Sequence, residues 1–234
     1  MKSLIFGIIL TTVAVILSVE GGIDAYMQKH SIILVIGGTI AIFFFATPDK
    51  SIKLTWQAFI KLFRKEERFE DYHAELESLA RSKTLASPSN NKLINYAAEL
   101  WEQGIDPNLF IVLVSQKKME IENDTSDALQ TLKNLSKYPP GLGITGTVMG
   151  MIALFSQIDS NKDNVGASIA LAMTATFFGL FLTNIIIAPI ADRIQIRYLN
   201  RKRMFSNIYK VLLLINQDEP DAIINNELEV ERVA

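Results

Sequence analysis

The chain has 234 residues, of which 49% are hydrophobic and 21% are charged, and its formal net charge at pH 7 is -2. A mean hydropathy of +0.23 is high for a soluble domain, so the apolar residues must be concentrated in membrane segments. The balanced charge gives no support for nucleic-acid binding, and the absence of cysteine excludes disulfides and thiolate chemistry.

Four apolar runs without a charged residue are each long enough to cross a bilayer core, at residues 3–19, 31–47, 142–158 and 165–190. The first also resembles a secretory signal peptide, but it is longer than a usual signal core and lacks a small-residue cleavage pattern. We therefore predict an all-α polytopic membrane protein with four transmembrane helices and a helical cytoplasmic lobe. The predicted division is 1–47 for helices 1 and 2, 48–138 for the lobe, 139–190 for helices 3 and 4, and 191–234 for a cytoplasmic tail.

The distribution of basic residues predicts the orientation of these helices. Lysines and arginines cluster directly after the second run, at Lys50, Lys53, Lys61, Arg64 and Lys65, and again after the fourth, at Arg193, Arg197, Arg201, Lys202 and Arg203. Basic residues close to membrane ends favour the cytoplasmic side. Both termini are then expected to be cytoplasmic.

The polar segment 48–138 has helical periodicity. Apolar residues recur three and four apart in 69–87 and 91–104, with breaks near Pro88 and Gly104. A third helix is expected to begin after "GIDPN" and is long enough to continue into the third membrane run after Pro139 and Pro140.

The sequence offers no catalytic centre. Its only histidines, His30 and His73, lack the spacing of a metal site, and no glycine-rich phosphate loop follows a predicted strand. We expect no enzyme activity, no metal and no cofactor.

Small residues and hydroxyls line one face of each of the last two membrane helices. In the third helix they are Gly143, Thr147 and Gly150, and in the fourth Ala172, Thr176, Gly179 and Thr183. Close helix packing alone explains such a face, because glycine, alanine and threonine are the residues that helix interfaces in lipid use.

Depth gives an alternative role to two of these hydroxyls. At 1.5 Å per residue, Thr147 and Thr176 lie about 15 to 16 Å from the outer ends of their helices, near the bilayer midplane, where they could face one another. Hydroxyls can hold water or a proton donor in a narrow apolar passage. Since no predicted span contains an ionisable residue, any titrating group must come from a partner.

Several stretches resemble the flagellar stator A subunit, the MotA and PomA family, and more distantly TolQ and ExbB. They are "EGGIDAYMQKHSIILVIGGTIAIFFFATPDK", "LWEQGIDPN", "PPGLGITGTVMGMIALF" and "ATFFGLFLTNIIIAPIADRI". The resemblance runs along nearly the whole chain. The "GGT" in the second span and the four-span arrangement are similar to the stator branch, since TolQ and ExbB have three spans.

This resemblance implies a bacterial inner-membrane protein that forms a ring of five A subunits around two helices of a MotB-like B subunit. The B subunit carries the membrane aspartate that binds the ion. By motif position, Thr147 and Thr176 match the hydroxyls that face this aspartate, and Pro140 and Pro189 match two prolines of conformational coupling. A purely structural role is the alternative, because Pro140 is at a helix start and Pro189 is near a membrane exit, where proline is tolerated.

The resemblance also implies a cytoplasmic contact with a rotor or switch protein. "LARSKTLAS" is similar to the rotor-facing stretch of the family, which makes Arg81 and Lys83 candidate contact residues. Pro88 and Ser89 stand where the family has a glutamate. The alternative is that Arg81 and Lys83 are solvated residues on an exposed helix face.

Two function classes remain open. The first is a stator subunit that couples inward ion flow to torque, and the second is a TolQ or ExbB type energiser of a periplasmic or outer-membrane system. A secondary transporter fits less well, because no midplane charge is present. Protons are favoured over sodium, because Ala175 precedes Thr176 where sodium-driven members of the family tend to have a second threonine.

Overall fold

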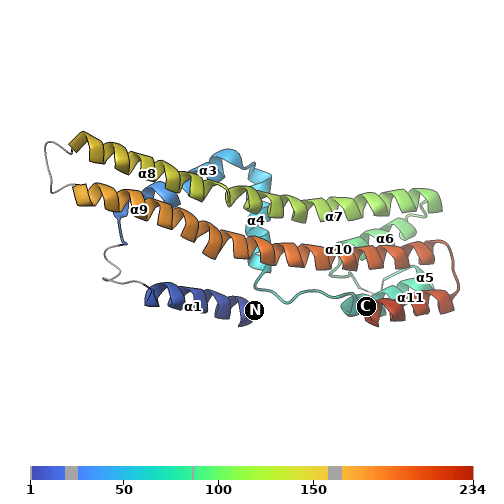
Figure 1. The fold of residues 1–234 in the computed structure, drawn as a ribbon. Coiled ribbons are helices and arrows are strands. Elements are labelled where there is room, and N and C mark those ends of the chain that lie inside the picture. The colour runs from blue at the N-terminus through green and yellow to red at the C-terminus, as the bar shows by residue number, and fades with distance from the viewer. Residues whose placement is uncertain (1, 19–25, 86, 158–164, 234) are drawn as a thin grey trace. The chain divides into compact units, whose positions relative to one another are not determined.

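The computed structural model describes residues 2–18, 26–85, 87–157 and 165–233. All regular structure in these ranges is helical, and they contain no strand (Figure 1). The chain divides into two compact units. The hairpin unit comprises Met1–Phe63 and Asp127–Ile194, and the lobe unit comprises Arg64–Ser126 and Gln195–Ala234.

The hairpin unit is built around α8 (Tyr138–Gln157) and α9 (Val165–Phe181), which lie side by side (Figure 1). A third helix packs against them. It begins as α2 (Lys29–Ile32), widens into the π-helical turn η2 (Ile33–Gly37) and ends as α3 (Gly38–Ala46). The remaining helices of this unit are α1 (Lys2–Leu17) and α4 (Asp49–Lys61).

The helices of the lobe unit are η3 (Phe69–Tyr72, a 3₁₀ turn), α5 (His73–Ser82), α6 (Lys92–Glu102) and α11 (Asp221–Val233). The long helices α7 (Pro107–Leu135) and α10 (Ala188–Asn216) contribute residues to both units. A second π-helical turn, η5 (Leu182–Ile187), joins α9 to α10 without interrupting the helix.

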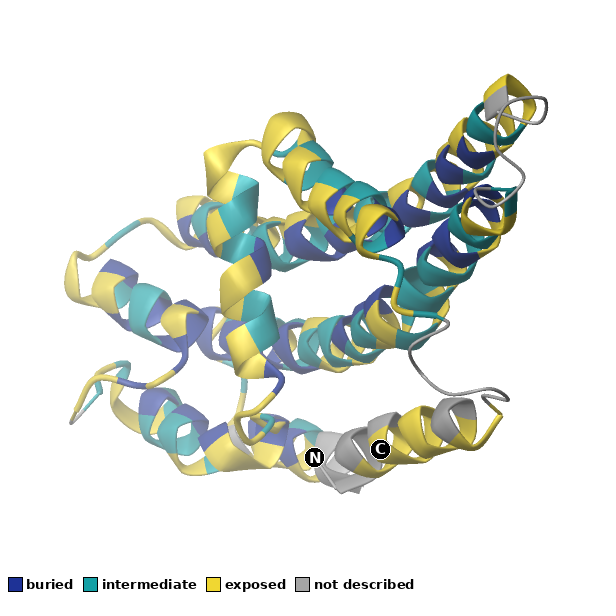
Figure 2. Cartoon of the chain, turned by 90° about the vertical axis from the view of Figure 1, so that its left-hand side faces the viewer, coloured by how far each residue is buried: buried dark blue, intermediate teal, exposed yellow. Residues whose placement is uncertain are grey.

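Apolar residues of six helical elements, η3, α5, α6, α7, α10 and α11, form the core of the lobe unit. Its fully buried side chains include Leu76, Leu79, Leu93, Ile94, Phe110, Phe205, Ile208, Leu212 and Leu228. Trp101 stacks on Phe110 with ring centroids 4.7 Å apart. Buried and exposed residues recur along the helices in Figure 2, as amphipathic helices require.

Local signals set the ends of the lobe helices as predicted. The Asn91 side chain accepts a hydrogen bond from the backbone N–H of Leu93, 2.9 Å away, and so caps the start of α6. α6 ends before Gly104, whose φ of +66° is a left-handed conformation that glycine adopts without strain. The predicted breaks near Pro88 and Gly104 are therefore confirmed.

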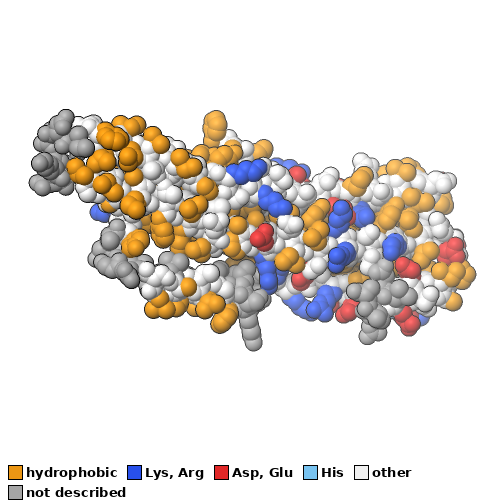
Figure 3. Space-filling model, viewed as in Figure 1, with side chains coloured by type: hydrophobic (Ala, Val, Ile, Leu, Met, Phe, Trp, Pro, Cys, Tyr) orange, Lys and Arg blue, Asp and Glu red, His pale blue; other side chains and the backbone are white. Residues whose placement is uncertain are grey.

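The described residues contain three helices that are long and apolar enough to span a membrane, at Lys29–Ala46, Pro107–Ser156 and Val165–Asn216. They correspond to the second, third and fourth predicted spans. The first predicted span overlaps α1, whose 16 residues are fewer than the roughly 20 that usually cross a bilayer core, and its last residue, 19, lies outside the described ranges. The predicted count of four spans is therefore not confirmed. Over α8 and α9 the surface in Figure 3 is mainly apolar, and charged side chains gather elsewhere.

Candidate functional site

The structure brings the predicted hydroxyls of Thr147 and Thr176 together. Their Oγ1 atoms share a hydrogen bond between α8 and α9, in which either can be the donor. The Oγ1 of Thr147 also lies 3.0 Å from the carbonyl oxygen of Ala172 and 3.1 Å from that of Gly143. Both threonines are partly exposed rather than sealed in the helix interface.

Glycines make this contact possible, because a Cβ at several of them would meet the facing helix. A Cβ on Gly143 would lie 3.1 Å from the Cα of Thr176, and one on Gly150 would lie 2.8 Å from the backbone nitrogen of Ala172. A Cβ on Gly179 would lie 2.5 Å from the carbonyl oxygen of Pro139. The small-residue face therefore serves close packing and positions the two hydroxyls at the same time.

The hydrogen bonds also limit what this pair can offer to a third group. Each hydroxyl has one proton, and the carbonyls of Gly143 and Ala172 together with the partner hydroxyl are enough to accept both. The remaining lone pairs on the two oxygens can only accept. In this arrangement the pair is suited to bind a water molecule or a protonated carboxyl group through its O–H.

A second hydroxyl pair was not predicted from the sequence. Ser31 at the start of the second span and Thr174 in α9 form a buried hydrogen bond of 2.7 Å. The Oγ1 of Thr174 is also 2.7 Å from the carbonyl oxygen of Ala170. This pair ties the second span to α9, and no spacing in the sequence predicts it, because Ser31 opens its apolar run whereas Thr174 lies in the middle of α9.

Pro140 lies in the first turn of α8, directly after Pro139. A proline there costs little, because the first backbone N–H groups of a helix have no helical acceptor. α7 ends at Leu135, so Ser136 and Lys137 separate it from α8. The hydroxyl of Thr183 donates a 3.0 Å hydrogen bond to the carbonyl oxygen of Ser136 and thereby satisfies a group that this break exposes.

Pro189 is the second residue of α10 and is exposed. Inside a helix its ring would clash with the carbonyl four residues earlier, at Ile185, and it provides no N–H. That carbonyl belongs to the π-helical turn η5, in which the wider backbone accommodates the proline. Thr183 lies in the same π-helical turn, and its hydrogen bond to Ser136 joins this turn, next to Pro189, to the α7–α8 break, next to Pro140.

Arg81 is in the last turn of α5, and its side chain is 71% exposed. Its guanidinium donates to the carboxylate of Glu77 at 2.6 Å, one helical turn earlier. The Nζ of Lys83 pairs with the Oδ1 of Asp218 at 2.5 Å. Both predicted rotor-contact cations thus have an acidic neighbour. The sequence predicts the Arg81–Glu77 pair, because the two residues are four apart on a helix, but it does not predict the pairing of Lys83 with the distant Asp218.

Ser89, which with Pro88 occupies the position where the resemblance predicts a glutamate, has a structural role. It is buried, and its hydroxyl bonds the carboxylate of Glu75 and accepts from the backbone N–H of Asn91 at 2.9 Å. Ser89 therefore stabilises the connection between α5 and α6. It does not extend the exposed charge of Arg81.

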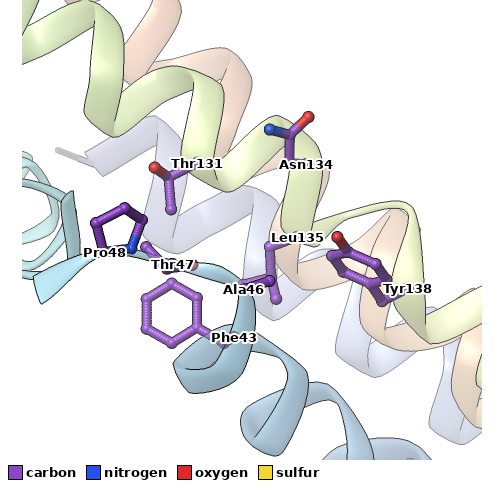
Figure 4. Close-up of a pocket in the computed structure, with 8 residues that line it drawn as sticks. All are labelled: Phe43, Ala46, Thr47, Pro48, Thr131, Asn134, Leu135 and Tyr138. Atoms are coloured by element: carbon purple, nitrogen blue, oxygen red, sulfur yellow. The ribbon is translucent and has the colours of Figure 1, made fainter.

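The described residues offer little to a cofactor. They contain no group of three or more histidine and acidic side chains that could hold a metal ion. One pocket lies where α3 ends, between Phe43, Ala46, Thr47 and Pro48 on one side and Thr131, Asn134, Leu135 and Tyr138 on the other (Figure 4). Its volume of about 140 Å³ is well below that of typical ligand pockets.

Residues 82–207 match the MotA/TolQ/ExbB proton channel family. The chain belongs to this family. The match includes both hydroxyls of the Thr147–Thr176 pair and both predicted prolines, whereas Arg81 lies one residue before it.

Individual relatives agree with this assignment over most of the chain. The chemotaxis protein PomA of Vibrio alginolyticus is 25% identical over 228 residues, which cover 89% of this chain and 87% of PomA. Motility protein A of Bacillus subtilis is 23% identical over 241 residues, which cover 97% of this chain and 89% of the relative. The resemblance to the MotA and PomA family is therefore confirmed.

Two solved structures have the same fold. C. jejuni MotAB superposes with a TM-score of 0.83 at 17% identity and covers 98% of this chain and 94% of that chain. The flagellar MotAB stator complex from Bacillus subtilis superposes with a TM-score of 0.80 at 21% identity, covering 95% and 92%. The all-helical prediction is confirmed along with the fold.

Proposed function

We propose that this chain is the channel-forming A subunit of a stator that couples inward proton flow to torque on a rotor. The observation that carries the proposal is the Thr147–Thr176 hydroxyl pair, partly exposed between two spans that the family match covers. A proton path needs polar groups that neither trap the ion by charge nor exclude water, and two hydroxyls satisfy this requirement.

The path also needs a titrating group, which a MotB-like partner with one membrane span and one membrane aspartate would supply. The hydroxyl pair is suited to accept a hydrogen bond from that aspartate while it is protonated. Deprotonation removes the donor and adds a charge, so the two states of the aspartate differ in their contact with α8 and α9. This difference is the free energy that could drive a step of the A ring around the B subunits. A ring of five A subunits is part of the proposal.

Membrane placement follows the same proposal. Four spans cross the bacterial inner membrane, both termini are cytoplasmic, and the domain limits are 1–47, 48–138, 139–190 and 191–234. The 16 residues of α1 extend over about 24 Å, which a locally thinned bilayer accommodates. The basic residues after the second and fourth spans support this orientation.

The output parts of the proposal are the prolines and the exposed cations. Pro140 and Pro189 adjoin the α7–α8 break and η5, two places where the helices depart from regular geometry, and these are suitable sites for a change of helix direction. Arg81, with Lys83 beside it, is the contact to a charged rotor or switch surface. The energiser alternative is less favoured, because relatives named as motility proteins align over nearly the whole chain.

Copurification tests the proposal most simply. The chain is coexpressed with the one-span protein of the adjacent reading frame and isolated in detergent, and the complex is imaged. A ring of A subunits around a partner with a peptidoglycan-binding domain is the expected result. A complex with a TonB-like or TolR-like partner would contradict the stator assignment and favour the energiser.

A further inference from the structure

The helix α4 (Asp49–Lys61) and the residue Phe63 beyond it present a row of largely exposed apolar side chains. Trp56 is 64% exposed, Ile60 is 42% exposed, and Phe63, just beyond the helix, is 50% exposed. Their spacing of four and three residues puts them on one side of the helix. Neighbouring exposed apolar residues indicate an interaction surface, whereas single exposed apolar residues do not.

This surface is ordered and distinct from the face that packs inward. Thr55 and Leu62 are buried, so the inward face of α4 is already in contact with the protein. On the outer side Trp56 stacks on Phe59 with centroids 6.1 Å apart, and Phe59 meets Phe63 edge to face at 5.4 Å. The exposed rings therefore form a continuous strip along the helix.

The position and direction of α4 relate this strip to a membrane surface. The candidate span Lys29–Ala46 ends three residues before α4 begins, and Pro48 is the N-cap of α4. Figure 1 shows α4 running across the direction of α8 and α9, which belong to the same unit. A helix that leaves a span and then turns across the spans lies along the bilayer face.

The charges beside the strip are almost all positive. From residue 49 to 65 the basic residues are Lys50, Lys53, Lys61, Arg64 and Lys65, and the single acid is Asp49. Lys53 is exposed at the edge of the helix next to Ile60. Apolar rings flanked by lysines are the composition of helices that insert at the interface of anionic membranes.

We propose that α4 binds anionic phospholipid in the membrane leaflet where the Lys29–Ala46 span ends. Trp56, Ile60 and Phe63 insert among the upper acyl chains, and Lys53 with its basic neighbours binds the headgroup phosphates. The apolar stems of the lysines can lie along the acyl region while their charged ends reach the phosphates at the surface. The proposal requires that the chain lies in a membrane but does not depend on an ion path. A second copy of the chain covering the same strip is the alternative.

Fluorescence quenching tests the apolar part, because the chain has only two tryptophans. The full chain with Trp101→Phe is placed in nanodiscs of phosphatidylcholine and phosphatidylglycerol brominated near the glycerol end of the acyl chains. Strong quenching of Trp56 is expected. The matched control is Trp56→Phe, in which Trp101 remains stacked on Phe110 in the lobe core and should be quenched little. Quenching of Trp56 no stronger than that of Trp101, as a covering second copy would give, overturns the proposal.

A second experiment tests whether α4 prefers anionic headgroups. Nanodiscs with equal mole fractions of the two lipids are prepared with either only the phosphatidylglycerol or only the phosphatidylcholine brominated. Brominated phosphatidylglycerol should quench Trp56 more than brominated phosphatidylcholine. Lys53→Gln should lower this preference by up to about fivefold, the effect of one cation at an anionic surface. Gln57→Ala removes a neutral exposed side chain from the same helix and should leave the preference unchanged. Equal quenching by both lipids, unaffected by Lys53→Gln, would contradict anionic lipid binding.

Discussion

Single glycines determine how closely α8 and α9 approach, and hence whether the two hydroxyls meet. The atoms facing Gly143, Gly150 and Gly179 are largely backbone, which cannot move aside as a flexible side chain can. Thr147 and Thr176 lie between these close approaches along the helices. The hydroxyl contact is therefore a consequence of packing, and packing and ion conduction are compatible roles for the same face.

Gly179→Ala should destabilise the hairpin by about 1 to 3 kcal/mol, the usual cost of overpacking. The added Cβ would lie 2.5 Å from the carbonyl oxygen of Pro139. Thermal unfolding of the detergent-solubilised chain measures the effect. Gly141→Ala is the matched control, because its Cβ meets nothing within 4 Å and alanine favours the helix. Equal losses in both variants would show that helix propensity, and not the close approach, decides the stability.

At the scale of whole elements, periodic patterns were the reliable signals. Charge-free runs predicted the second, third and fourth spans, and a spacing of three and four residues predicted the lobe helices. The two π-helical turns and the Lys83–Asp218 pair could not be predicted, because they arise from contacts between residues far apart in sequence or from local backbone widening without a residue signature. The Thr147–Thr176 contact was predictable because both hydroxyls have the same depth on small faces.

The lobe core contains a buried tyrosine whose ionisation should weaken the fold at alkaline pH. Burial first, and then the negative charges of Glu67, Glu75 and Asp71, raise the pKa of Tyr72 above its ordinary value. The unfolded phenol ionises near pH 10, so the stabilisation is fully present below about pH 10 and is lost as pH rises above it.

Tyr72→Phe removes this group while keeping the ring. The variant should lose less lobe stability than the parent between about pH 10 and 12, since it lacks the tyrosine that resists ionisation. Emission of Trp101, measured in a Trp56→Phe background, reports unfolding of the lobe. Parallel loss of stability in both proteins over this range would mean that other groups, such as lysines, account for the whole alkaline effect.

For the whole molecule, the family match and the superpositions extend from the spans to the lobe, whereas the proposed rotor contact depends on a few exposed charges. Arg81 already pairs with Glu77. An exposed pair of this kind contributes only about 0 to 1 kcal/mol, so it leaves Arg81 available to a stronger partner surface. The lobe would carry the output by sweeping this cation past the rotor.

Arg81→Glu should lower torque more than Arg81→Ala, because only the reversal adds repulsion. The reversal also repels Glu77, so a third variant with Glu77→Arg and Arg81→Glu restores the helix pair while keeping the rotor-facing charge altered. Torque is compared at equal membrane abundance, with ion conductance measured separately. Full recovery of torque in the double variant would mean that Arg81 acts only within α5. Loss of conductance in all variants would instead assign the lobe to channel support.

Proton flux through the assembled complex tests the central claim most directly. The chain and its one-span partner are reconstituted in vesicles, and uptake driven by a potassium-valinomycin potential is compared for the parent, Thr176→Val and Thr145→Val. Valine keeps the shape of threonine and removes the hydroxyl, and Thr145 is an exposed threonine of α8 whose hydroxyl bonds only within its own helix. We predict that Thr176→Val lowers flux about tenfold, the value of one lost hydrogen bond, while Thr145→Val leaves it unchanged. Unchanged flux in Thr176→Val, in a complex of intact size and composition, would contradict the assignment of this hydroxyl pair to the ion path.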